Sequence, residues 1–448
     1  MLIRFPEQRK WSLLLASYFF YGFWDWRFTI LLFTCSGFNY IMALGISNAK
    51  YRKHKKVWLI TAVIMDLGIL FFFKYYGFFM NSVNNISLML GLSEGLPILS
   101  VVLPVGISFF TFQAMSYVID VYRGEIHARE SLGDVLLYIS FFPQLVAGPI
   151  VRASVFLPQL DTNPAEDQIP AGTAFVRIIA GLFKKTVIAN YLAVLLVDPV
   201  FLDPASYSPL ELVLGAYGYA FQIFCDFSAY SDIAIGIATL LGYKFPENFN
   251  QPYRATSFQD FWRRWHISLS SWLRDYLYIP LGGSKSGGFK TYRNLFITML
   301  LGGLWHGAAW NFIIWGGLHG TALVIERKLG LVKKMNGFAG KLLKRVIVFQ
   351  VVCVCWIFFR ASDLRVAGEF FMGFTHNREF QGVITPFTVL LLLIGLIMHF
   401  TPSGIKGSLG RGTARLPALL QGTLFGGFLL ILHILSPQGV APFIYFQF

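Results

Sequence analysis

An uncharged stretch of 32 residues, Asn294 to Ile325, constrains most strongly how this chain can fold. The basic residues that flank it on both sides are Lys285, Lys290 and Arg293, then Arg327, Lys328, Lys333 and Lys334. Because Lys and Arg favour the cytoplasmic side of a membrane, both flanks are expected there, so the stretch must enter the membrane and return. At about 1.5 Å per residue it makes two helical limbs of about 24 Å, with the turn in residues 304–311.

His306 falls in that predicted turn. It would lie about 18 Å from the cytoplasmic end, near the middle of a hydrocarbon core about 30 Å thick. A titratable side chain at such depth is costly and by default marks a functional site. The alternative is a hydrogen-bonded packing contact between helices.

The composition indicates a membrane protein. Hydrophobic residues make up 55% of the chain and charged residues 13%, whereas a soluble domain carries roughly a quarter charged residues. The runs long enough to span a membrane, or nearly so, lie around 11–24, 27–48, 57–80, 97–119, 134–151, 172–197, 210–242, 294–325, 346–359, 384–400 and 416–436. They predict an all-α polytopic membrane protein with roughly ten to twelve membrane-embedded segments. Residues Gly148 and Pro149 predict a broken or re-entrant element in the run 134–151.

The net charge of +14 is concentrated in loops, in clusters around residues 50–56, 341–345 and 406–415. This distribution is what the positive-inside rule predicts, so the expected partner is the lipid bilayer and no nucleic acid is expected. The four cysteines lie in apolar sequence without a metal-binding spacing, and no metal site is predicted.

A second histidine, His266, falls in a pattern of aromatic and leucine residues at helical spacing. The pattern predicts an amphipathic helix over residues 257–277, at the cytoplasmic interface or beneath the helix bundle. At about 100° per residue His266 shares a face with Trp262 and Leu269, so it is expected to point into protein or membrane. There His266 and His306 can line one cavity. A packing role for His266 is the equal alternative.

Two polar clusters precede this helix. Asp226 and Ser228 lie within an otherwise apolar segment, as the polar wall of a substrate tunnel or as a network that stabilises a broken helix. The turn-rich loop 246–254 can bind a polar ligand from the cytoplasm or serve only as a structural connection. Its candidate binding residues are Asn248, Asn250, Tyr253 and Arg254.

The stretches FWRRWHISLS (261–270), WLRDYLYI (272–279) and LGGLWHG (301–307) closely resemble the membrane-bound O-acyltransferase family, and within it the bacterial alginate O-acetyltransferase branch. The resemblance runs to about residue 365. It implies one domain over 1–448, with a core at about 100–360 and a less distinctive helical tail at 361–448. Family members usually begin with another apolar segment, whereas residues 1–6 here lead directly to Trp11, so the number of spans on that side stays open.

The resemblance implies a ring of helices around a thinned centre, crossed by a tunnel, in a bacterial inner membrane. The two family histidines correspond to His306 and His266, and Trp305 to a binding position beside them. The implied donor is acetyl-CoA or an acyl thioester on a carrier protein, entering from the cytoplasm, with no bound cofactor. The implied acceptor lies outside: a polysaccharide hydroxyl, or a hydroxyl on a partner acetyltransferase. D-Alanyl is the nearest competitor to acetyl as the acyl group.

The chemistry of imidazole agrees with this assignment. Acyl transfer to a hydroxyl needs a base that works near neutral pH, and imidazole has a reference pKa of ~6.5. We therefore expect His306 to act as the general base or the transient acyl acceptor, and His266 to help position the thioester. Arg254, Arg263 and Arg264 are either phosphate contacts for the donor or surface anchors.

Two other classes of protein remain as alternatives. A transporter for a polysaccharide precursor would need paired intramembrane charges and usually repeated halves, and neither is apparent in the sequence. A non-catalytic scaffold of a polysaccharide export complex is the second alternative. Consumption of the thioester distinguishes an enzyme from both.

Overall fold

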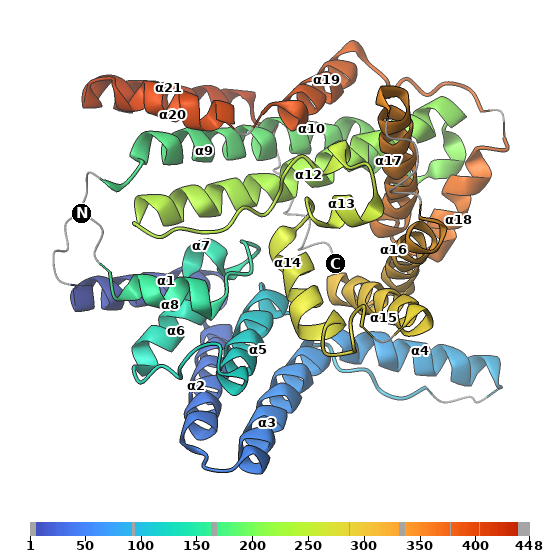
Figure 1. The fold of residues 1–448 in the computed structure, drawn as a ribbon. Coiled ribbons are helices and arrows are strands. Elements are labelled where there is room, and N and C mark those ends of the chain that lie inside the picture. Colours follow the sequence, from blue (N-terminus) through green and yellow to red (C-terminus); the bar gives the residue numbers. More distant parts are fainter. Residues whose placement is uncertain are drawn as a thin grey trace. The chain divides into compact units, whose positions relative to one another are not determined.

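The computed structural model describes residues 6–91, 95–162, 168–285, 287–330, 337–376, 378–402 and 404–437, and within these ranges it contains helices and no strand (Figure 1). The predicted all-α fold is thereby confirmed. Residues 1–5, on which the question of a further N-terminal segment bears, lie outside the described ranges. The chain divides into two compact units, residues 1–169 with 238–246 and residues 170–237 with 247–448. The single domain over 1–448 stays a prediction.

Several of the predicted runs are long, apolar helices. Among the described residues, the six that are long and apolar enough to cross a membrane are Trp26–Asn48, Arg52–Met89, Ala171–Leu202, Pro209–Leu240, Phe338–Arg360 and Ala418–Leu435. A seventh candidate is a helix pair, α19 (Pro386–Phe400) and α20 (Gly404–Ala414), bent by 87°. These segments establish a multi-pass membrane protein.

Two predicted runs are not continuous helices. Within 97–119, helix α5 (Ile107–Arg123) begins only at Ile107, after a stretch without helix. Gly106 precedes it with φ of +75°, and a Cβ there would lie 2.5 Å from the carbonyl oxygen of Leu145, so the chain needs glycine at this contact. The run 134–151 divides into α6 (Leu132–Ser140) and the short α7 (Phe142–Leu145). The run is broken, as predicted, but it divides at Phe141 and its last helical residue is Leu145, before Gly148 and Pro149.

The first unit is built on three long N-terminal helices. Its helices before α5 are α1 (Pro6–Trp24), α2 (Trp26–Asn48), α3 (Arg52–Leu70), which continues through a π-helical turn (Phe71–Tyr75), and α4 (Tyr76–Met89). Helices α2, α3 and α5 contact one another, and α8 (Ala153–Leu160) contacts α5 and α6. Their apolar faces share one core that includes Leu32, Phe110 and Tyr138, all with no exposed surface.

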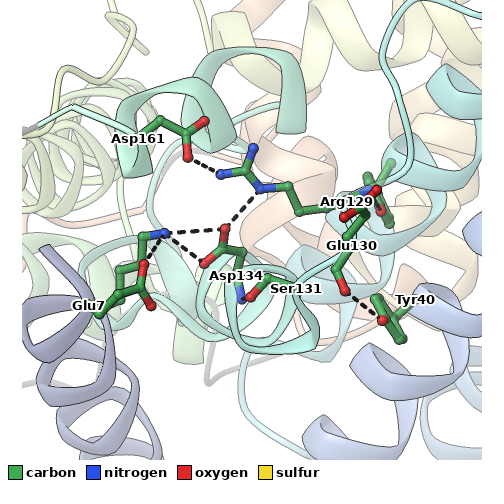
Figure 2. Close-up of polar contacts among 9 residues, drawn as sticks. Glu7, Tyr40, Arg129, Glu130, Ser131, Asp134 and Asp161 are labelled. Carbon is green, nitrogen blue, oxygen red and sulfur yellow. Dashed lines mark hydrogen bonds and ion pairs between the residues drawn. The ribbon is translucent and has the colours of Figure 1, made fainter.

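Polar contacts hold the loop between α5 and α6 in place (Figure 2). The Arg129 guanidinium forms ion pairs with Asp134, at 2.8 Å, and with Asp161 at the end of α8. Lys10 of α1 reaches the same Asp134 at 3.3 Å. The Arg129 pairing lowers the pKa of Asp161. One buried carboxylate therefore links α1, this loop and α6.

The second unit contains most of the remaining helices. Its first half comprises α9 (Ala171–Phe183), π-helical turns at Lys184–Ala189 and Ala193–Val197 around α10 (Asn190–Leu192), α11 (Asp198–Leu202) and most of α12 (Pro209–Leu240). Its second half comprises α13 (Phe258–Trp262), α14 (Ile267–Leu273), a π-helical turn (Arg274–Tyr278), α15 (Gly288–His306), α16 (Trp310–Leu329), α17 (Phe338–Arg360), α18 (Leu364–Gly373), α19, α20 and α21 (Ala418–Leu435).

Helices α15 and α16 form the hairpin expected from the uncharged stretch, and they lie side by side in Figure 1. Glycines face each other where the two helices touch. A Cβ at Gly303 would collide with the Phe312 carbonyl and would lie 3.0 Å from the Cα of Gly316. The hairpin turn follows directly after His306, as predicted.

A buried carboxylate and amide in the first unit give a test of this fold. Asn39 of α2 donates its Nδ2 to Asp66 Oδ1 of α3 at 2.9 Å, while Asn39 Oδ1 and Asp66 Oδ2 have no donor among the described residues. An amide at position 66 would supply that donor. We therefore expect Asp66→Asn to leave the melting temperature of the purified protein unchanged or raise it. Asp66→Leu removes one acceptor of the Asn39 amide and leaves it only the Cys35 carbonyl, so this variant should lose about 1–3 kcal/mol. Equal destabilisation by both variants would contradict this account.

Candidate active site

The helix predicted over residues 257–277 is interrupted, and this prediction is wrong. Helix α13 ends at Trp262, α14 starts at Ile267, and His266 between them has φ of +42°. The loop before the helix causes the break, because its backbone bonds to the intervening residues. Asn250 N–H donates to the Arg264 carbonyl, and Ile267 N–H donates to the Asn248 carbonyl, both at 2.9 Å.

The Asn248 side chain completes this arrangement. Its Oδ1 accepts hydrogen bonds from Ser268 N–H at 3.1 Å and Ser268 Oγ at 2.9 Å, and lies 3.2 Å from His266 Nδ1. Its Nδ2 donates to Ser231 Oγ of α12 at 3.0 Å. Since an amide oxygen only accepts, His266 Nδ1 must carry the proton and Nε2 the lone pair.

His266 is buried, as predicted, although through this turn and not through a helical face. Its ring lies against Phe227 of α12, with centroids 4.6 Å apart, and no part of the residue is exposed. Burial lowers the pKa of His266 to about 3, so the imidazole is neutral at pH 7. Trp265 and Trp272 are also buried.

Trp305 brings the two predicted histidines into one cluster. Its indole lies 6.0 Å from the His266 ring and 5.0 Å from the His306 ring, measured between centroids. His306 ends α15, is 3% exposed, and also contacts Trp315 of α16 and Phe359 of α17. The structure therefore brings His266, Trp305 and His306 together, as three of the predicted site residues, and adds Trp315 and Phe359, which the sequence analysis did not select.

His306 and the hairpin turn after it pack against the last turns of α17. Its ring is 5.3 Å from that of Phe359, and Asn311 donates to the carbonyls of Phe358 and Ala361. Phe359 is 21 residues, or about 31 Å, from the start of α17, where the basic cluster of residues 341–345 lies. The His306 imidazole therefore contacts the half of α17 that is farther from this basic cluster.

A cluster of buried ion pairs is formed by two acidic residues of α12, the helix whose Phe227 contacts His266. Asp232 forms ion pairs with Arg177 at 2.8 Å, Lys184 at 2.7 Å and Lys406 at 2.8 Å. Asp226 pairs with Lys185 at 2.7 Å. Sequence analysis missed these basic partners, although Lys184 and Lys185 interrupt the apolar run 172–197 and were the available signal. Helix α12 is continuous here, so the alternative of a broken helix at Asp226 is wrong.

These contacts also correct one argument about function. The sequence showed no paired intramembrane charges, and that absence weighed against a transporter. Two such groups lie on helical runs long and apolar enough to cross a membrane. The pairs remove that argument, so the class of protein has to be decided on other grounds.

A polar cavity of about 440 Å³ opens beside this cluster. The predicted binding residues on its wall are Ser228, Asn248 and Asn250, and the basic residues are Arg177, Lys184 and Lys406. Tyr253 is instead buried, with its hydroxyl donating to the Ala220 carbonyl at 2.6 Å. Arg254 is exposed and donates to Gln251 at 2.8 Å. Neither Tyr253 nor Arg254 lines this cavity.

A second cavity, of about 310 Å³, lies along α13, α14, α15 and α16. Its wall carries Arg263, Arg274 and Arg327 together with the hydroxyls of Ser270, Ser271 and Thr298. Arg274 pairs with Asp275 at 2.6 Å, whereas Arg263 and Arg327 form no ion pair with any residue in the described ranges. Ile267, next to His266, lines both cavities.

Two buried histidines on either side of one indole, in a multi-pass membrane protein, are a candidate site for acid–base chemistry. Comparison with known proteins agrees: the family model described as MBOAT, membrane-bound O-acyltransferase family, matches residues 125–362. The chain belongs to the membrane-bound O-acyltransferase family and is an O-acyltransferase.

Three relatives indicate the range of chemistry within that family. The probable alginate O-acetylase AlgI of Pseudomonas putida is 40% identical over 469 residues, which cover 98% of this chain and 94% of the relative. The peptidoglycan O-acetyltransferase of Helicobacter pylori is 39% identical, over 82% of this chain and 74% of the relative. The teichoic acid D-alanyltransferase of Streptococcus thermophilus is 31% identical, over 61% and 69% respectively.

The ion-pair cluster gives a stability prediction. Asp232→Leu removes the carboxylate that three cations share and leaves Lys184, which is 5% exposed, without its anion. Removing one partner of a buried pair costs about 3–5 kcal/mol. Glu369→Gln, which removes the largely exposed pair with Arg365, is the matched control and should cost at most about 1 kcal/mol. Thermal denaturation of the purified variants should separate them clearly; equal melting temperatures would show that the cluster does not stabilise the fold.

Proposed function

We propose that this chain transfers an acetyl group from a cytoplasmic thioester to a hydroxyl on the outer side of the membrane. The observation that carries the proposal is the contact series from His266 through Trp305 to His306. These residues fall inside the segment that the family model matches. Acetyl is preferred because two of the relatives named as O-acetyl enzymes are 39–40% identical, against 31% for the D-alanyl relative.

The proposed setting is a bacterial inner membrane. Basic clusters at the start of α17 and along α20 support a cytoplasmic position for those ends. The candidate spans and the shorter helices would together make a ring of ten to twelve embedded segments around a thinned centre, acting as one domain. The α15–α16 hairpin would be the re-entrant element, with its tip toward the outer side because it meets the far end of α17.

The proposed donor site is the second cavity, of about 310 Å³, which lies along α13, α14, α15 and α16. Arg263 and Arg327, which have no ion-pair partner in the described ranges, would bind the phosphates of acetyl-CoA or of a carrier protein's pantetheine arm. Thr298 on the wall of this cavity is eight residues before His306, or about 12 Å along α15. The thioester would extend along that helix toward the two imidazoles.

In the proposed reaction His306 is the general base. It accepts the proton of the attacking hydroxyl while the hydroxyl oxygen bonds to the thioester carbonyl carbon. The carbon–sulfur bond then breaks, and the proton passes to the thiolate that leaves. His266, held neutral with its Nδ1 toward Asn248, would orient the thioester from the cytoplasmic side. Trp305 would close the path between the two rings and exclude water.

The proposed acceptor is a polysaccharide hydroxyl of the alginate type, or the hydroxyl of a partner acetyltransferase outside the membrane that completes the transfer. The outward position of the hairpin tip supports an acceptor on that side. The relatives named for alginate and peptidoglycan acetylation both fit this acceptor class.

The direct test replaces His306 by alanine. Loss of a general base lowers acyl transfer by about 10²–10⁴-fold, so acetyl-CoA consumption by the purified protein and O-acetyl content of the surface polysaccharide should both fall. Membrane levels of the variant should match those of the wild type. The control is His376→Ala, at an exposed histidine after α18, which should leave both readouts unchanged.

Unchanged acetylation by His306→Ala at normal membrane levels would refute the assignment of His306. Acetyl-CoA consumption by neither protein would favour a non-catalytic scaffold.

A further inference from the structure

A third cavity, of about 450 Å³, lies between α12, α17 and α19 and is almost wholly apolar. Its lining includes Phe221, Val346, Phe349, Leu393 and Leu396. Helices α12 and α17 are long and apolar enough to cross a membrane, and α19 belongs to the bent seventh candidate. The cavity therefore lies between helices that can cross a membrane, and its size is in the range of small-molecule sites.

Arg345 is the charged residue on that wall. It is the last residue of the basic cluster at 341–345 and lies about 10 Å from the start of α17. It forms no ion pair with any described residue, and its buried Nε atom has no hydrogen-bond partner among them. Two further polar side chains on the wall bond to each other, with the Gln350 amide donating to the Tyr217 hydroxyl. Arg345 therefore offers a guanidinium to a ligand from outside the protein.

The cavity is distinct from the polar cavity beside the ion-pair cluster. Tyr253 lines the apolar cavity and His399 lines the polar one. The two rings stack with centroids 5.0 Å apart, and the Tyr253 N–H donates to His399 Nε2 at 3.1 Å. This stacked pair forms a wall between the apolar space and the polar groups on α12.

We propose that the apolar cavity binds an anionic phospholipid, with one acyl chain among α12, α17 and α19 and its phosphate on Arg345. The lining matches a hydrocarbon chain, and the unpaired guanidinium near the basic end of α17 matches the phosphate of a cytoplasmic-leaflet lipid. A zwitterionic lipid with the same chains would fill the cavity but would add an ammonium group near Arg345. The lipid would serve as a structural ligand that holds the three helices together, independently of the acyl-transfer reaction.

The test measures which lipid stays bound. The full chain is reconstituted with equal amounts of phosphatidylglycerol and phosphatidylcholine carrying identical chains, then purified into detergent, and the retained lipid is measured by native mass spectrometry. We expect the wild type to retain phosphatidylglycerol preferentially. Arg345→Gln should retain about fivefold less of it, which is the change in affinity expected when one basic residue near an anionic lipid surface is lost. Lys341→Gln is the matched control: the same charge is removed from the same helix one turn earlier, outside the cavity wall.

A second variant keeps the test open if Arg345→Gln does not fold. Leu396→Trp fills the cavity while Arg345 remains, and it should lose the retained lipid to a similar extent. Equal retention of the two lipids by the wild type would overturn the proposal. So would retention of phosphatidylglycerol by Arg345→Gln or Leu396→Trp at the level of Lys341→Gln. These outcomes do not depend on acyl transfer, so they leave the proposed reaction to its own test.

Discussion

The geometry of the histidine site depends on the side chain of Asn248. Its oxygen faces the His266 ring and accepts from Ser268, its amide donates to Ser231 of α12, and its own carbonyl receives Ile267. Without these contacts, nothing would offset the cost of the positive φ at His266, and the preferred path would be the continuous helix that the sequence pattern predicts. The loop thus turns one imidazole into the second unit's interior, fixes its tautomer and sets it against the indole that touches His306.

The second constraint is electrostatic. Charges on membrane helices are expensive unless paired, and here Asp232 and Asp226 lie against lysines and an arginine of neighbouring elements. Arg177, Lys184 and Lys406 of the polar cavity each pair with Asp232, whereas Arg263 and Arg327 of the second cavity are not paired within the described ranges. This difference is the physical reason for placing the donor phosphates in the second cavity and not beside the ion-pair cluster. The ion pair between Lys406 and Asp232 also connects α20 to α12.

The sequence predicted those features that follow from local pattern. Uncharged runs located most of the long helices, and basic residues on both sides of 294–325 predicted the hairpin that ends α15 at His306. Long-range contacts were not accessible in this way. The break at His266 comes from a loop some eighteen residues earlier, and the partners of Asp232 come from α9, its following π-helical turn and α20. The depth of His306 in the membrane stays a prediction, whereas its packing beside the end of α17, through Asn311, was not accessible from the sequence. The roles of Asn250 and Arg254 in binding remain predictions.

In the proposed reaction the donor binds at the basic face and the acyl group is delivered near the opposite face. The most direct measurement supplies labelled acetyl-CoA, which does not cross membranes, to inverted and to right-side-out vesicles from cells that make the acceptor. We expect label in lumenal O-acetyl groups of inverted vesicles, its loss with His306→Gln, and almost none in right-side-out vesicles. Equal labelling in both orientations, or labelling that persists with His306→Gln, would contradict it.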